Sequence, residues 1–176
     1  MIVVKKAVPM RAFQLGTVCP IGQQLMDAQL LRPLPEGLWE VRTRETEGQG
    51  EIAKTGDYVK LDSIGMPYPV EKDWFEQNHT QTEDGLYLQK QQPRKAWCKE
   101  ESMCEEMRFL LRHDILQWDR ETGFGAQLWG TWQRADSDAV IVFDRVDTDA
   151  AGEIQQVAFH FVAGEEFRIT YEILPS

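Results

Sequence analysis

The stretch GDYVKLDSIGMPYPVEKDWFE, from Gly56 to Glu76, carries the strongest structural pattern in the chain. It begins with the pair Gly56-Asp57, which is typical of turns because glycine tolerates a positive φ. From Tyr58 to Asp62 the residues alternate, so that Val59 points to one side and Lys60 to the other. This alternation predicts a β-strand with one buried face.

The second half of this stretch predicts an extended segment followed by a short helix. Pro67 and Pro69 keep the chain extended, because each proline restricts the backbone of the residue before it. Val70, Trp74 and Phe75 then have the spacing of one apolar helix face. The whole stretch therefore predicts a strand, a turn and a helix in close succession.

The aromatic residues of this stretch permit two interpretations. Apolar residues at such spacing usually belong to a core, which would bury Trp74 and Phe75. Alternatively, Tyr58, Tyr68 and Trp74 form a recognition surface, because aromatic side chains are enriched at the centres of interfaces. Tyr58 and Tyr68 are therefore binding candidates. We expect Gly65, which lies between them, to adopt a positive φ or to allow a close backbone approach.

Five spaced elements of the chain form a recognisable pattern, namely Lys5–Gln14, Thr43–Glu45, Gly56–Val59, Gly65–Pro69 and Phe75–Glu76. This pattern resembles that of small bacteriophage and prophage proteins of unknown function. The resemblance covers about residues 3–80. It departs from the group's pattern at Thr55, where a proline is usual, and at Asn78-His79, where a tyrosine is usual. The resemblance implies a phage-derived origin, and it carries no known active site from which a catalytic residue could be transferred.

The charge of the chain is strongly acidic. The net charge is −10 and the isoelectric point is about 4.8, which disfavours nonspecific binding to nucleic acids or to anionic membranes. The apolar start Met1–Val4 is followed at once by Lys5-Lys6, so we expect no signal peptide. No apolar run reaches the length of a membrane span. These features predict a cytoplasmic protein with no membrane partner.

The pattern along the chain predicts an α+β fold, mainly antiparallel β-sheet with two to three short helices. A β-rich module with short helices is expected over 1–80, and a helix followed by an antiparallel sheet over 81–176, with one continuous domain as the alternative. The polar segment Asn78–Gly85 is the expected boundary. The predicted C-terminal strands are Ile115–Arg120, Ala126–Arg134, Ala139–Arg145, Ile154–Val162 and Phe167–Leu174.

The helix expected in the second part starts near Ser102. Ser102 and Glu105 have the spacing of a capping box, which predicts a helix start. Met103, Met107 and Leu110 then follow with helical spacing. The pattern predicts a helix that buries one apolar stripe.

No residue pattern in the chain indicates a catalytic, metal or cofactor site. The loop from Asp147 to Glu153 is acidic but fails the spacing of a calcium-binding EF-hand. Cys98, Cys104 and His113 lack the spacing of zinc ligands. The odd number of cysteines, with Cys19 as the third, predicts free thiols. We therefore expect no catalytic residue, no metal and no cofactor.

Two tryptophans of the C-terminal part are further binding candidates. Trp129 and Trp132 are three positions apart, so on a regular strand they would point to opposite faces. One would then be buried and the other exposed. His160 alternates with Phe159 and Phe161, so it is expected to face away from both.

Three functions from different classes fit these observations. The first is a non-enzymatic, phage- or prophage-derived protein that acts by binding another protein. The second is a small-molecule-binding or hydrolytic domain with a pocket in the C-terminal sheet, using Trp129 or Trp132 together with Asp144 or His160. The third is an acidic inhibitor of a nucleic-acid enzyme. The lack of a catalytic constellation favours the first.

Overall fold

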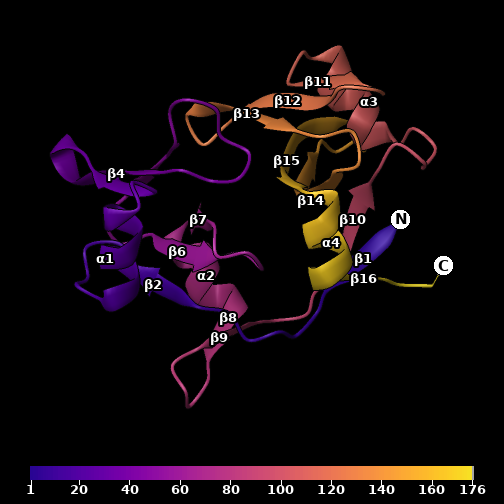
Figure 1. Cartoon of the computed structure of the whole chain (residues 1–176). Helices are drawn as coiled ribbons and strands as arrows, with labels where there is room; N and C mark the ends of the chain where they lie inside the picture. Colours follow the sequence, from indigo (N-terminus) through magenta and orange to yellow (C-terminus); the bar gives the residue numbers. More distant parts are fainter. Residues whose placement is uncertain (176) are drawn as a thin grey trace. The chain divides into compact units, whose positions relative to one another are not determined.

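The computed structural model describes residues 1–175 and divides the chain into two compact units (Figure 1). Unit 1 contains Met1–Lys6, Gln92–Leu128 and the chain from Trp132 onward, and unit 2 contains Ala7–Gln91 and Trp129–Thr131. The fold is α+β and mainly antiparallel β-sheet, which confirms the predicted class. These units have other bounds than the expected ranges 1–80 and 81–176. The first six residues join the C-terminal part because they form a strand of its sheet.

Unit 2 consists of small antiparallel sheets and two short helices. Its strands are β2 (Ala12–Gln14), β3 (Leu31–Pro33), β4 (Leu38–Val41), β5 (Glu51–Lys54), β6 (Tyr58–Leu61), β7 (Pro67–Val70), β8 (His79–Gln81) and β9 (Tyr87–Gln89). Its helices are α1 (Pro20–Asp27) and α2 (Lys72–Asn78), with a 3₁₀ turn over Pro35–Gly37. The sheets have the orders β2-β6-β7, β3-β4-β5 and β8-β9.

The strand and helix predicted for the stretch from Gly56 to Glu76 are present as β6, β7 and α2. Val59 on β6 is fully buried and Phe75 on α2 is 1 % exposed, as the core interpretation predicts. Gly65 has a φ of +86°, which confirms the expected backbone conformation. Trp74 is only half-buried, because Phe75 takes the inward position on this short helix.

The segment from Asn78 to Gly85 is part of unit 2. Asn78 ends α2, β8 follows directly, and Gly85 lies in the turn that leads to β9. β8 and β9 pair in register from His79↔Gln89 to Gln81↔Tyr87. A polar segment without apolar periodicity therefore forms a hairpin here, because its strands are too short to show a pattern.

Unit 1 is built on a five-stranded antiparallel sheet. The order is β15 (Ile154–Val162), β14 (Val140–Thr148), β10 (Arg94–Trp97), β1 (Ile2–Lys5) and β16 (Tyr171–Ile173). A second sheet contains β11 (Leu116–Asp119), β12 (Gly123–Leu128) and β13 (Thr131–Ala135). The helices are α3 (Glu105–Arg112) and α4 (Gly164–Thr170).

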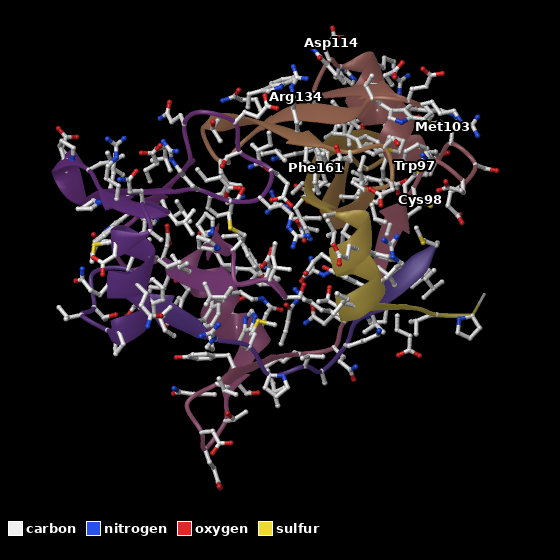
Figure 2. The ribbon with its side chains drawn as sticks, in the orientation of Figure 1. Trp97, Cys98, Met103, Asp114, Arg134 and Phe161 are labelled. Carbon is white, nitrogen blue, oxygen red and sulfur yellow. The ribbon has the colours of Figure 1, made fainter. Side chains whose placement is uncertain are left out.

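The five-stranded sheet is buried on both faces. Alternate residues of β14 and β15 belong to two separate apolar clusters, as the two-residue period of a strand requires. The first cluster includes Trp97, Met107 and Phe161, two of which are labelled in Figure 2. The second includes Val142 and Phe167, so that α3 covers one face and α4 the other.

Three predicted elements of unit 1 are wrong in detail. The predicted strand Phe167–Leu174 is instead the end of α4 followed by β16, since Phe167 and Tyr171 stack with ring centroids 5.1 Å apart. α3 begins after Cys104 without a side-chain cap, so Ser102 lies two positions before the N-cap and the predicted capping box does not form. The predicted strand Ala126–Arg134 is interrupted by a turn.

The packing of α2 generates a test of the core. Phe75 lies between Tyr58 and His79, with ring centroids 3.9 and 4.1 Å away. We expect Phe75→Ala to lower the free energy of unfolding by about 3–5 kcal/mol, as for other buried aromatic residues. Trp74→Ala is expected to cost clearly less, because Trp74 is half-buried. Urea unfolding followed by circular dichroism measures both, and a larger cost for Trp74→Ala would contradict this packing.

Candidate functional site

The densest polar cluster of unit 1 lies on the α4 side of the five-stranded sheet. Strand alternation brings Arg94 of β10, Asp144 of β14 and His160 of β15 to this side, together with Val142 and Val162. A register shift between Phe143 and Arg145 leaves Asp144 without an opposite partner on β15. The carboxylate of Asp144 is thereby directed toward its polar neighbours.

Asp144 and His160 form the centre of this cluster. His160 Nδ1 lies 2.7 Å from Asp144 Oδ2, and the other carboxylate oxygen of Asp144 accepts a hydrogen bond from Arg94. The hydroxyl of Tyr171 is 3.4 Å from His160 Nε2. Since Nδ1 donates to the carboxylate, Nε2 of the neutral imidazole is an acceptor for the phenol. The arrangement therefore fixes the orientation of a His160 side chain that is 38 % exposed.

Burial and neighbouring charges shift three pKa values in this cluster. Burial raises the pKa of Asp144, but His160, Arg94 and Lys5 together hold it below its ordinary value. Burial and the charge of Asp144 raise the pKa of Tyr171 well above its usual range. Burial lowers the pKa of Lys5 to about 8, against the opposing effect of Glu166. Tyr171 is thus kept as a neutral phenol, which makes it a hydrogen-bond donor and a poor nucleophile.

This cluster was only partly accessible to sequence reasoning. The alternative with a pocket in the C-terminal sheet uses Asp144 or His160, and the structure brings these two side chains together. Lys5, Arg94 and Tyr171 were missed, because β1, β10 and β16 come from distant parts of the chain. His160 does face away from Phe159 and Phe161, which both belong to the opposite cluster, as predicted.

The four binding candidates are divided between the units. Tyr58 is half-buried, and its ring stacks on Phe75 while its hydroxyl lies 3.4 Å from a carboxylate oxygen of Glu76. Tyr68 is half-buried opposite Lys60, whose Nζ is 5.6 Å from the centroid of its ring. Both rings are therefore engaged within unit 2.

The two tryptophans differ from the predicted arrangement. Trp129 is not on a strand but in the turn between β12 and β13, where it is 42 % exposed. Trp132 is half-buried on β13 and packs tightly against Gly125, where a Cβ atom would lie 2.5 Å from the indole. Trp129 and Trp132 do not alternate on one strand, because the turn interrupts the predicted strand. One ring is nevertheless exposed and the other packed.

A buried cation in unit 2 was also missed. Lys60 is 2 % exposed, although it was expected on the solvent side of its strand. Its Nζ lies 2.9 Å from His79 Nε2 and donates to Gln89 Oε1 at 3.0 Å. His79 Nδ1 donates to the carbonyl of Phe75, which leaves Nε2 as an acceptor for the ammonium group. Lys60 is thus held by acceptors from neighbouring elements of unit 2.

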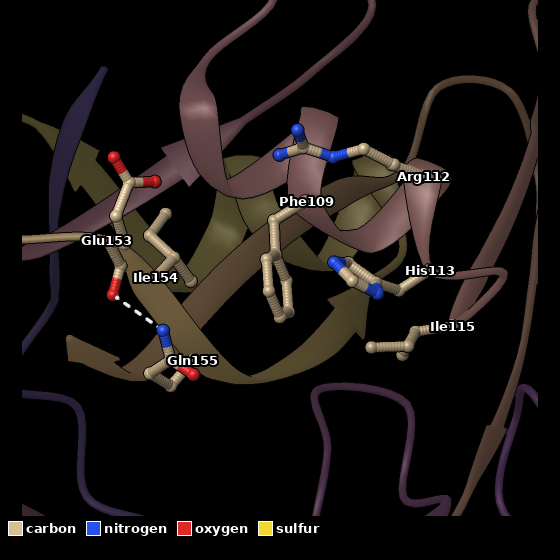
Figure 3. A pocket seen from close by; sticks show the side chains of 7 residues that line it. All are labelled: Phe109, Arg112, His113, Ile115, Glu153, Ile154 and Gln155. Atoms are coloured by element: carbon tan, nitrogen blue, oxygen red, sulfur yellow. Dashed lines mark hydrogen bonds between the residues drawn. The ribbon is translucent and has the colours of Figure 1, made fainter. Parts of the chain in front are cut away.

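An open pocket of about 480 Å³ lies at the C-terminal end of α3, beside the start of β15 (Figure 3). Phe109 and Ile154 supply apolar surface, Arg112 and His113 supply groups that can carry positive charge, and Glu153 supplies a carboxylate. The pocket belongs to unit 1, and neither Asp144 nor His160 lines it. None of the four predicted binding residues lines it either.

The described residues contain no group of three or more His, Cys, Asp or Glu side chains that could hold a metal ion. Cys19, Cys98 and Cys104 are free and partly buried. Burial raises the pKa of the Cys98 and Cys104 thiols, so both are poor nucleophiles at neutral pH.

No protein-family model matches the chain, and neither a curated protein nor a solved structure was found to be similar to it. Within residues 1–175, no helix has the length and apolar character needed to cross a membrane.

The environment of Lys5 generates a second test. Titration of the ¹³C-methylated lysines by NMR is expected to show one resonance, lost in Lys5→Arg, with a pKa of about 8. Glu166→Gln should lower this value further, because the charge of Glu166 raises the pKa of Lys5. A Lys5 resonance that titrates above pH 10 would contradict the burial of this amine.

The same shift has a consequence for stability. The unfolded chain keeps Lys5 protonated up to about pH 10.5, whereas the folded chain releases the proton near pH 8. Between these values the unfolded state binds more protons, so the contribution of Lys5 to stability increases as pH rises. In urea unfolding, the wild type should therefore gain stability relative to Lys5→Met across this interval. If the difference in free energy of unfolding between the wild type and Lys5→Met stays constant with pH, the ionisation of Lys5 is not linked to folding.

Proposed function

We propose that this chain is a non-enzymatic protein of phage or prophage origin that acts in the cytoplasm of a bacterial host by binding another protein. The exposed side chain of Trp129 is the observation that carries this proposal. The proposed binding surface, here called the Trp129 surface, consists of Trp129, Ile52 and Leu38. It uses no cofactor and contacts neither nucleic acid nor membrane.

Trp129 occupies a turn position whose backbone geometry favours other residue types. Trp129 and Gly130 form a two-residue connection between β12 and β13, with φ values of +49° and +73°. Such turns favour Asn, Asp or Gly at the first position, because a positive φ strains a bulky side chain. Strained residues concentrate at functional sites. The strain and the exposed indole together support a role in binding.

The backbone of this turn is firmly held within unit 2. The carbonyl of Trp129 accepts the backbone N–H of Ile52 at 3.1 Å. The hydroxyl of Thr131 donates to the carbonyl of Gln49 at 3.0 Å. A rigid backbone that presents a large aromatic side chain loses little entropy on binding, which is the usual property of an interface anchor.

The neighbouring residues supply an apolar surround with a polar rim. Ile52 lies next to the turn, since a Cβ atom at Gly130 would be 3.7 Å from its side chain. Leu38 is 37 % exposed and shares the face of β4 and β5 with Ile52, and Lys54 lies directly opposite it. Protein interfaces commonly combine an apolar centre with such a rim.

The alternative with a hydrolytic or small-molecule-binding role draws support from the Asp144–His160 pair. We place it second for two reasons. The hydroxyl of Tyr171 already faces His160 Nε2, and Asp144 is also bound by Arg94. The network is thus satisfied internally, which is the property of a structural polar cluster.

Replacement of Trp129 by asparagine separates folding from binding. Asparagine tolerates the left-handed conformation, so Trp129→Asn is expected to keep the stability of the wild type or to raise it by up to about 1 kcal/mol. Loss of the indole should weaken partner binding by about 2 kcal/mol or more, which is about 30-fold. The measurement is quantitative affinity capture from phage-infected host cells, followed by calorimetry with the captured partner.

Val18→Asn is the matched control, because Val18 is a fully exposed apolar residue of the same unit. This variant should bind as the wild type does. The proposal fails if Trp129→Asn captures the same proteins with the same affinity. It also fails if both variants lose binding equally, since a general loss of exposed apolar surface would then explain the result.

A further inference from the structure

The pocket at the end of α3 has walls of opposite charge. Arg112 and His113 lie at the C-terminal end of this helix, and Glu153 immediately precedes β15 on another wall (Figure 3). Phe109 and Ile154 lie between them and form an apolar floor. Phe109 is 8 % exposed, and its ring is 4.5 Å from that of His113, measured between centroids.

The charged groups of this pocket are not neutralised within the described part of the chain. The side chains of Arg112 and Glu153 make no hydrogen bond and no ion pair there, either with each other or with another residue. The backbone of Glu153 is engaged, since its N–H donates to the carboxylate of Asp149 and its carbonyl accepts from the N–H of Asp149 and from the side chain of Gln155. The position of Arg112 in the last turn of α3 explains its sign, because cations are favoured at helix C-termini. Arg112, His113 and Glu153 are all exposed, so a ligand in the pocket can reach all three side chains.

We propose that this pocket binds a small zwitterion with an apolar body, in the class of the large neutral α-amino acids. The carboxylate of the ligand lies against Arg112 and His113, its ammonium group against Glu153, and its side chain on Phe109 and Ile154. A volume of about 480 Å³ lies within the range of ligand pockets, about 300–1,000 Å³. This site is independent of the Trp129 surface.

Each part of the ligand is required by a different part of the pocket. An inorganic anion would leave Glu153 without a partner and would be repelled by it. A simple amine would leave Arg112 without a partner and would be repelled by its positive charge. A ligand without an apolar body would gain nothing from the apolar surface that Phe109 and Ile154 supply to the pocket.

The test is isothermal titration of the full-length chain with L-leucine and L-phenylalanine. Saturable binding is expected, with a dissociation constant of about 1 mM or lower. N-acetyl-L-leucine lacks the cation, L-leucinamide lacks the carboxylate, and glycine lacks the apolar body. Each of these three compounds should bind at least about tenfold more weakly, corresponding to the loss of about 1.4 kcal/mol.

Variants of exposed residues locate the binding. Arg112→Gln and Glu153→Gln should each weaken leucine binding by about tenfold or more without changing the unfolding temperature. Arg108→Gln is the matched control, because Arg108 is an exposed arginine of α3 that does not line the pocket. It should bind leucine as the wild type does.

Three results would each overturn the proposal. The first is the absence of saturable binding of both amino acids at 10 mM, about ten times the expected dissociation constant. The second is equal binding of leucine, leucinamide and N-acetyl-leucine. The third is unchanged binding in both Arg112→Gln and Glu153→Gln.

Discussion

The pairing of the first strand with two strands from the second half of the chain is the constraint on which unit 1 depends. β1 lies between β10 and β16, so its backbone is bonded on both sides. The carbonyl of Met1 accepts from the N–H of Ala96, and the carbonyl of Ile2 accepts from that of Leu174. Without β1, β10 would become an edge strand and β16 would lose its only neighbour in the sheet. β1 thus joins β16 to the rest of the sheet.

The polar cluster follows directly from this pairing. Lys5 faces Tyr171 across the β1–β16 pair, and Arg94 on β10 reaches Asp144. Their charges act on one another at a partly buried sheet face, so the pKa of Tyr171 rises while that of Asp144 falls. Several polar groups can occupy such a position only because each one finds a partner. The cluster therefore helps to specify which strands pair in this sheet.

The local elements of the chain were predictable where one pattern dominated. The alternation from Tyr58 to Asp62 and the prolines at 67 and 69 gave β6 and β7 correctly, and Phe75 is buried as its spacing indicates. Lys60 was misplaced because alternation assumes that one face of a strand meets solvent. Here His79 and Gln89 cover the second face, and no local pattern carries that information.

The helix α4 and the candidate sites also depend on contacts that no local sequence pattern reveals. The run from Phe167 to Leu174 fits a strand, but in the fold Phe167 belongs to α4, and the strand begins only at Tyr171, on whose ring Phe167 stacks. Trp129 was identified as a candidate, although its turn was not, because Trp-Gly is an unusual pair for a hairpin connection. The pocket combines the end of a helix with the start of a distant strand, which only the folded chain brings together.

The central structural claim is that β1 is an interior strand and not a loose terminus. Amide hydrogen exchange, measured residue by residue by NMR, tests this most directly. The amides of Val3, Val4 and Lys5 are expected to exchange as slowly as those of Ile141 and Val142 on β14, since they open only when the sheet opens. Exchange of the three N-terminal amides at the rate of an unstructured terminus would contradict the account.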